Sequence, residues 1–139
     1  MTTFTGVLAV LHTPTTDGRQ LDEPGPDLTR PLPLPLVRPG EPGIGRINRV
    51  WQDGNLLRYA GTLDDEHPDA DAIATGIRAG RLVGMLDADD AKIRHQNGNL
   101  FSDRAADTLT VMSGWRVMAV TLMPSEGKAW PEVSLTLDA

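Results

Sequence analysis

Short apolar runs alternate along the chain with polar segments rich in Gly, Pro, Asn and Asp, a pattern typical of strands joined by turns. The run from Phe4 to Leu11 predicts a first strand, and the polar stretch from Thr13 to Arg30 predicts a long loop. Two further runs, Ile44–Trp51 and Leu56–Leu63, are separated by Gln-Asp-Gly-Asn. Because Asp-Gly supplies the positive φ angles of a tight turn, these two runs predict a β-hairpin.

One segment has helical rather than strand periodicity. Within Asp69–Gly80, Ile73 and Ile77 lie four residues apart and therefore share one face of a helix. Acidic residues occupy the first turn, where the helix dipole favours them, and Gly80 can adopt the left-handed conformation that ends a helix. A single short helix is predicted here.

The second half of the chain predicts more strands. The run Trp115–Met123 is mostly apolar and is the strongest candidate for a buried strand, whereas Val133–Leu137 alternates strictly and predicts a half-buried one. The other runs are Leu82–Leu86, Ala91–His95 with Leu100–Phe101 across a turn, and Thr108–Met112. Seven or eight strands with one or two short helices predict a mainly β single domain over residues 1–139, a small antiparallel β-barrel.

The segment from Thr29 to Ile47 begins with prolines that alternate with leucines. Such a run is a candidate polyproline II ligand, because it is stiff before it binds. The intervening residues are leucines, however, and full burial of each would contribute about 1.5–3 kcal/mol. We therefore interpret the segment as a structural connector packed against the barrel.

Composition narrows the classes of function. The 139 residues, 40% of them hydrophobic, suffice for one domain with a buried core. The net charge of −6 opposes a nucleic-acid backbone. Absence of cysteine excludes disulfides, thiolate nucleophiles and zinc–thiolate sites. No run has the length of a membrane span or the form of a secretion signal. A soluble, non-secreted protein is expected.

Motifs for cofactors and metals are weak. Asp87, Asp89 and Asp90 could surround a hard cation, but the glycine and distal glutamate of a calcium loop are missing. Gly43-Ile-Gly45 lacks the third glycine and following helix of a dinucleotide loop. No cofactor, metal or catalytic residue is predicted from these motifs.

Serine and histidine are both present, so a nucleophile and base pair has to be considered. We expect each histidine to be a solvated loop residue. The residues concerned are His12, His67, His95, Ser102, Ser113, Ser125 and Ser134.

The order of short motifs along the chain resembles that of the prohead (capsid maturation) proteases of tailed bacteriophages, serine proteases related in fold to the herpesvirus assemblins. The resemblance implies a small β-barrel flanked by helices. The matching segments are Phe4–Leu8, Thr16–Arg19, Arg30–Leu36, Gly45–Ile47, Ala60–Leu63, Leu82–Gly84 with the acids that follow, Val120–Pro124 and Ala129–Val133.

The residues that would carry the family's chemistry are replaced in this chain. Activity in the family requires a histidine between the Leu-Pro-Leu run and the Gly-Arg-Ile strand, but Val37–Ile44 is short and contains none. Where the family has its serine, the chain has Met85 and Leu86, neither of which can attack a carbonyl. The third motif, Trp115–Thr121, offers no acid or histidine. The Pro-rich segment then reads as a shortened remnant of the active-site loop.

A protease-like barrel without its triad is expected to bind rather than cut. The resemblance therefore implies a non-catalytic virion protein, an auxiliary or decoration protein that binds the major capsid protein as a homo-oligomer or symmetric array. It would be assembled in the host cytoplasm and bind neither nucleic acid nor membrane. Trp51, Trp115 and Trp130 are candidate anchors, although the core is the commoner place for tryptophan.

Two alternatives stay open. One is an active maturation protease with a rearranged pair, Ser102 with His95 or Ser113 with His12. The other is an internal assembly scaffold that leaves before DNA enters.

Overall fold

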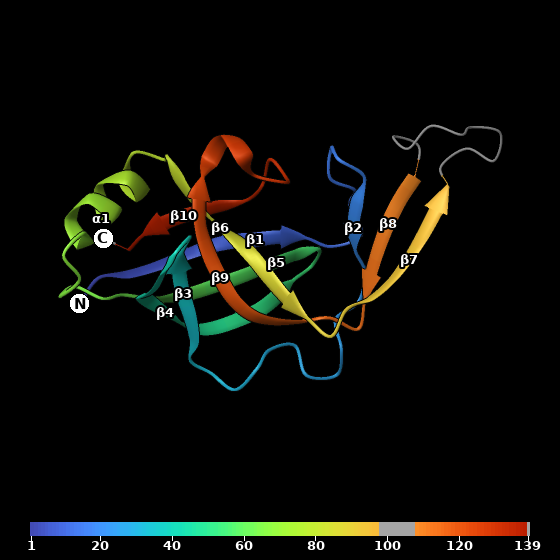
Figure 1. Ribbon diagram of the computed structural model, residues 1–139, viewed down its shortest axis with the longest axis horizontal. Helices are drawn as coiled ribbons and strands as arrows, with labels where there is room; N and C mark the ends of the chain where they lie inside the picture. The colour runs from blue at the N-terminus through green and yellow to red at the C-terminus, as the bar shows by residue number, and fades with distance from the viewer. Residues whose placement is uncertain (98–107, 139) are drawn as a thin grey trace.

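The computed structural model describes residues 1–97 and 108–138, which form a mainly β structure with one α-helix (Figure 1). A seven-stranded sheet, sheet A, has the order β10-β1-β5-β4-β3-β9-β6, and a three-stranded sheet, sheet B, has the order β2-β8-β7. The elements are β1 (Thr3–Val10), β2 (Arg19–Leu21), β3 (Leu34–Arg38), β4 (Glu41–Asp53), β5 (Leu56–Leu63), α1 (Ala70–Arg78), β6 (Leu82–Asp89), β7 (Lys92–Asn97), β8 (Thr108–Ser113), β9 (Arg116–Pro124), the 3₁₀ turn η2 (Ser125–Gly127) and β10 (Ser134–Leu137).

The predicted hairpin and helix are both confirmed. Strands β4 and β5 pair antiparallel as far as Asp53 opposite Leu56, and Gly54 adopts a φ of +60° in the turn between them. In α1, Ile73 and Ile77 are buried, and Gly80 follows the helix with a φ of +71°. The helix contacts β6 and β10, so it covers one end of sheet A. No helix in the described residues is both long and apolar enough to cross a membrane.

Sheet A curls into a half-barrel around an aromatic pair. Phe4 and Tyr59 are fully buried and meet edge to face, with ring centroids 5.9 Å apart. The strands pass so close to this pair that a Cβ at Gly61 would lie 2.8 Å from Phe4 Cζ. One at Gly84 would lie 2.4 Å from the Tyr59 hydroxyl oxygen. The absence of a side chain at these two positions therefore permits the curvature.

The Pro-rich segment is not only a connector. Residues 34–38 form strand β3, which lies inside sheet A between β4 and β9. The leucine alternation predicts burial correctly here, since Leu34 and Leu36 are buried, whereas Leu32 is 46% exposed. Pairing with β9 begins only at Leu36. The preceding prolines, which have no N–H to donate, lie before this parallel ladder and therefore remove no hydrogen bond from it. The expectation of a pure connector is therefore wrong for these residues.

One other expectation is corrected by long-range pairing. The predicted loop Thr13–Arg30 contains strand β2, which pairs parallel with β8, about ninety residues further along the chain. Although only Gly114 and Trp115 separate them, β8 and β9 belong to different sheets. The expected burial of β9 is confirmed. The proposed strand at Leu100–Phe101 lies outside the described residues.

Candidate functional site

Strands β6 and β9 contain two of the segments that the sequence analysis singled out, Leu82–Gly84 with the residues that follow and Trp115–Thr121, and pair them side by side. Met85 on β6 lies opposite Thr121 on β9, and the Thr121 hydroxyl donates a hydrogen bond to Asp87 Oδ2 at 2.6 Å. A hydroxyl becomes a nucleophile when a base such as imidazole takes its proton. None of the hydrogen bonds of the three histidines, all of which lie in the described residues, reaches Thr121. The threonine–aspartate contact therefore ties the two strands together, and no histidine takes part in it.

His12 is held by two carboxylates rather than by a serine. Its Nε2 lies 2.8 Å from Glu23 Oε1, and its Nδ1 lies 3.3 Å from Asp22 Oδ1. It is exposed, as expected, but both ring nitrogens have these acidic partners. The bond to Glu23 and the nearby charge of Asp22 raise the pKa of His12 above its usual 6.5. The proposed Ser113–His12 pair is therefore not formed.

This arrangement predicts a pH dependence of stability. Because the folded-state pKa of His12 is raised, its stabilising contribution is fully present below pH 6.5 and is lost as the pH rises through the folded pKa. Urea midpoints measured from pH 6 to pH 9 should show this loss, and His12→Gln should remove it. Glu126→Gln, a change at an exposed acid elsewhere, serves as the control. An NMR titration that places the His12 pKa at or below 6.5 would contradict the assignment.

His95, Ser125 and Ser134 are likewise engaged elsewhere. His95 lies on β7, is exposed and has Nδ1 3.3 Å from the Thr110 hydroxyl of β8. Ser125 donates to the carbonyl of Gly80, and Ser134 accepts from the backbone of Val7. Ser102 lies outside the described residues, so the proposed Ser102–His95 pair remains a prediction.

A second ionic cluster links the β3–β4 turn to the start of α1. Arg38 donates from Nε to Glu41 Oε2 at 2.9 Å and from Nη2 to Asp69 Oδ2 at 2.7 Å. His67 Nε2 bonds to the other oxygen of Glu41, and His67 Nδ1 accepts the backbone N–H of Asp69 at 3.0 Å. The side chain of His67 is only 11% exposed, so the expectation of a solvated loop residue is wrong.

The same cluster has the residue types of a metal site. Ligand atoms of Glu41, His67 and Asp69 all lie within 4.8 Å of one another. Arg38, however, already forms ion pairs with both carboxylates. Because His67 Nδ1 accepts a hydrogen bond, Nε2 carries the ring hydrogen and has no lone pair for a metal. We therefore interpret the cluster as a structural lock, meaning an ion-pair network that joins the β3–β4 turn to the start of α1.

Removing the arginine should weaken this lock. Its hydrogen bonds lower the pKa values of Glu41 and Asp69, so their contribution is present near neutral pH and is lost as the pH falls through the lowered pKa values. Arg38→Met should lower the urea midpoint at pH 7 and flatten its decline between pH 5 and pH 3. Arg58→Met, which breaks the Asp53 pair on the exposed hairpin, is the matched control. Equal midpoints for the two variants at pH 7 would contradict the lock.

The acidic run after β6 is also paired. Asp89 bonds to Arg30, and Asp90 Oδ2 lies 2.8 Å from Arg116 Nε. Since Asp87 is bonded to Thr121, all three acids have partners within the protein. They hold the end of β6 rather than surrounding a cation.

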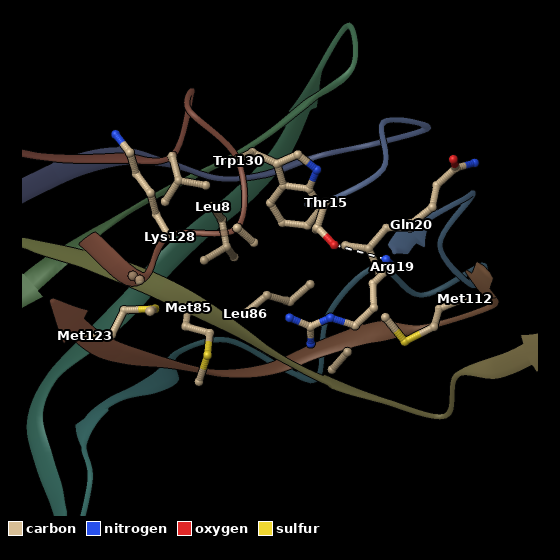
Figure 2. A pocket seen from close by; sticks show the side chains of 16 residues that line it. Leu8, Thr15, Arg19, Gln20, Met85, Leu86, Met112, Met123, Lys128 and Trp130 are labelled. Carbon is tan, nitrogen blue, oxygen red and sulfur yellow. Dashed lines mark hydrogen bonds between the residues drawn. The ribbon is translucent and has the colours of Figure 1, made fainter. Parts of the chain in front are cut away.

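A cavity of about 140 Å³ borders the inner side of β6 (Figure 2). Apolar side chains from strands β1 and β6 and from the loop before β10 line it, together with Arg19 and Lys128. Trp130 is fixed there because its indole N–H donates to the carbonyl of Thr13 at 2.8 Å. The backbone N–H of Arg19 donates to the Thr15 hydroxyl at 3.0 Å. The lining comes from distant segments, so no local motif in the sequence could have predicted it.

A second, more open hollow of about 380 Å³ lies over Met85 and Thr121, between α1 and Arg38. The two hollows share Met85 and Met123. Of the three tryptophans, Trp115 and Trp130 are buried, and Trp51 packs its ring 4.1 Å from the Arg49 guanidinium. The surface at the candidate site is therefore apolar, and methionine rather than exposed tryptophan supplies it.

Comparison with family models, with curated proteins and with solved structures gave no match. The Thr121 hydroxyl of the β6–β9 pair is bonded to the Asp87 carboxylate and to no histidine. The adjoining hollows have apolar linings that also include Arg19, Lys128 and Arg38. This arrangement is suited to binding.

Proposed function

We propose that this chain is a non-catalytic structural protein of a tailed-phage virion. It would act as an auxiliary or decoration protein that binds the major capsid protein and stabilises the shell. The observation that carries the non-catalytic part is the strand pair β6–β9, where Met85 faces Thr121 and no histidine contacts either residue. The phage assignment rests on the ordered motifs of the sequence.

The glycines in those motifs support an inherited scaffold rather than inherited chemistry. Gly6, Gly61 and Gly84 belong to three different motifs, and a Cβ at each would fall within 3 Å of the Phe4 or Tyr59 side chain. What the motifs share is thus the packing of the aromatic core. We infer that the curled sheet A is the counterpart of the family's small antiparallel barrel, with the cutting residues replaced.

The surface properties agree with a place in a shell. Met85 on β6 and Met118 on β9 are 44% and 40% exposed, so these two strands present apolar side chains that a shell contact would cover. The net charge of −6 favours a position away from packaged DNA. Many copies in a symmetric array would bind firmly even if each contact were weak.

Binding and cutting can be separated in one experiment. The purified protein is incubated with shells of the cognate major capsid protein, the shells are sedimented, and the masses of both proteins are measured. We expect the protein to sediment with the shells and the capsid protein to keep its mass. Cleavage of the capsid protein that Ser113→Ala or Ser102→Ala abolishes would establish the alternative, an active maturation protease.

A further inference from the structure

Strand β7 is the outer edge of sheet B. The order β2-β8-β7 places β8 on one side of it, and no strand in residues 1–97 or 108–138 pairs with the other side. In Figure 1, β7 lies at the right-hand end of the fold, with β8 between it and β2. In an antiparallel pair, every second residue directs its N–H and C=O away from the partner strand. This edge therefore offers main-chain donors and acceptors to an added strand.

The side chains of β7 leave room for such a strand. Lys92, Ile93, Arg94 and His95 are all exposed, although successive residues of a strand point to opposite faces of the sheet. Among the described elements, β8 is the one that packs along β7. The edge is therefore covered by no described element on either face of the sheet.

An apolar row crosses sheet B and ends at this edge. Leu21 on β2 lies opposite Met112 on β8, and Met112 lies opposite Ile93 on β7. Exposure rises along the row, because Leu21 is buried, Met112 is half-buried and Ile93 is 60% exposed. An apolar side chain on an added strand, opposite Ile93, would extend the row and cover its exposed end.

The other face of β7 is cationic. Lys92 and Arg94 flank Ile93 in the strand, so their side chains lie on the face opposite to it. Arg94 Nη2 lies 3.3 Å from Asp22 Oδ2, but its side chain remains 67% exposed. Lys92 has no ion-pair partner in the part of the chain that the structure describes. Carboxylates on an added strand, opposite Lys92 and Arg94, would complement both cations.

The same charges disfavour a second copy of β7 as the added strand. Antiparallel pairing of two copies about Ile93 would place Lys92 of each copy opposite Arg94 of the other. Like charges directly opposite each other destabilise a strand pair, and lysine on an edge strand commonly prevents such pairing. The charge of the edge therefore selects an acidic strand.

We propose that the outer edge of β7 pairs with an extended, acidic segment of a partner polypeptide. The segment sets carboxylates opposite Lys92 and Arg94 on one face of the sheet and a branched apolar side chain opposite Ile93 on the other. The inference rests on the proposed binding role, because it names the surface through which that binding occurs. Main-chain pairing supplies the affinity, and the alternation of acidic and apolar residues supplies the specificity.

The probe for this edge is the blocked peptide acetyl-Thr-Glu-Val-Glu-Val-Thr-amide, titrated into the full-length protein at low salt and followed by NMR. Saturable shifts are expected for the amides of residues 92–95 and for the methyl groups of Ile93. Absence of saturable shifts there would overturn the inference and leave the cations with the role of keeping the edge unpaired.

Protein variants test the two contacts separately. Lys92→Glu should weaken peptide binding about fivefold at low salt, since it replaces an exposed attraction by a repulsion. This loss should shrink at about 1 M salt, where charges are screened. Ile93→Ser should weaken binding about threefold at either salt concentration. Arg81→Glu, which makes the same change of charge at an exposed residue outside sheet B, is the control and should leave the affinity unchanged. An equal loss in Lys92→Glu and Arg81→Glu would contradict a specific contact.

Peptide variants test the mode of binding. Replacing both glutamates by lysine should abolish the shifts. Two N-methylated peptides are compared, each methylated at every second amide in one of the two possible phases. One phase removes the donors that face β7 and should abolish binding, whereas the other leaves them in place and should bind. Binding of both peptides as tightly as the parent peptide would exclude strand pairing and overturn the inference.

The double variant Lys92→Glu, Ile93→Ser separates this inference from the proposed function. Once its NMR spectrum has shown that it is folded, it is sedimented with capsid shells beside the parent protein, and loss of shell binding is expected. Unchanged shell binding would overturn the β7 edge as the contact and leave the shell role intact. If the parent protein bound the peptide but not the shells, the shell role would be overturned and the edge would stand as a site for another acidic partner. Self-association that the peptide displaces would identify the chain itself as the occupant and contradict the proposal.

Discussion

Trp115→Ala is expected to destabilise the protein by about 3–5 kcal/mol, the range for truncating a large buried aromatic side chain. Trp115 is fully buried at the point where the chain passes from sheet B to sheet A. Its indole N–H donates to the carbonyl of Asp22 at 2.9 Å, and its own carbonyl accepts from Gly25 at 2.8 Å. Urea denaturation measures the loss, which is a large fraction of a typical domain's stability.

The control for this variant is Trp51→Ala. Trp51 is half-buried and its main contact is with the Arg49 guanidinium, so its loss should cost about 1 kcal/mol. A similar loss of stability in both variants would show that Trp115, at the junction of the sheets, contributes no more than the half-buried Trp51. Retention of one cooperative transition in Trp115→Ala at reduced stability would show that the sheets still unfold together.

Gly84→Ala is expected to cost about 3 kcal/mol through overpacking. The added methyl group would lie 2.4 Å from the Tyr59 hydroxyl oxygen and 2.7 Å from Val120 Cγ1, and both neighbours are fully buried. Burial also raises the pKa of Tyr59, so the hydroxyl stays protonated across the ordinary pH range and the clash should not depend on pH there. The free energy of unfolding from urea titration measures the effect.

A matched control and a rescue test the cause. A Cβ at Gly127 would meet only the flexible end of Met123, at 2.8 Å, so Gly127→Ala should cost little. Adding Tyr59→Phe to Gly84→Ala removes the nearest clashing atom and should recover part of the lost stability. If the double variant were no more stable than Gly84→Ala alone, the hydroxyl would not be the source of the clash.

Local signals predicted the elements whose cause is local. The Asp-Gly turn correctly predicts the β4–β5 hairpin, and the spacing of Ile73 and Ile77 correctly predicts α1. The sequence pattern does not predict β2. Its three residues are flanked by polar segments and form a strand only because they pair with the distant β8. The strand within the Pro-rich segment is not predictable for the same reason, since it depends on pairing with β4 and β9 from other parts of the chain.

Less of the candidate site could be predicted. The motif comparison drew attention to Met85 and Thr121, which the fold does place opposite each other. The cavity beside β6 was not foreseen, because Arg19, Lys128 and Trp130 come from segments that only the tertiary fold brings together. The sequence does not predict the burial of His67, because that burial depends on Arg38 and Glu41, which lie on strands distant from it in the chain.

Quantification of the protein in purified, DNA-filled particles tests the shell-binding role most directly. We predict that it is present uncleaved, in a fixed ratio to the major capsid protein that matches the symmetry of the shell. Its absence from filled particles, together with its presence in empty precursors, would contradict the account and establish the internal scaffold instead.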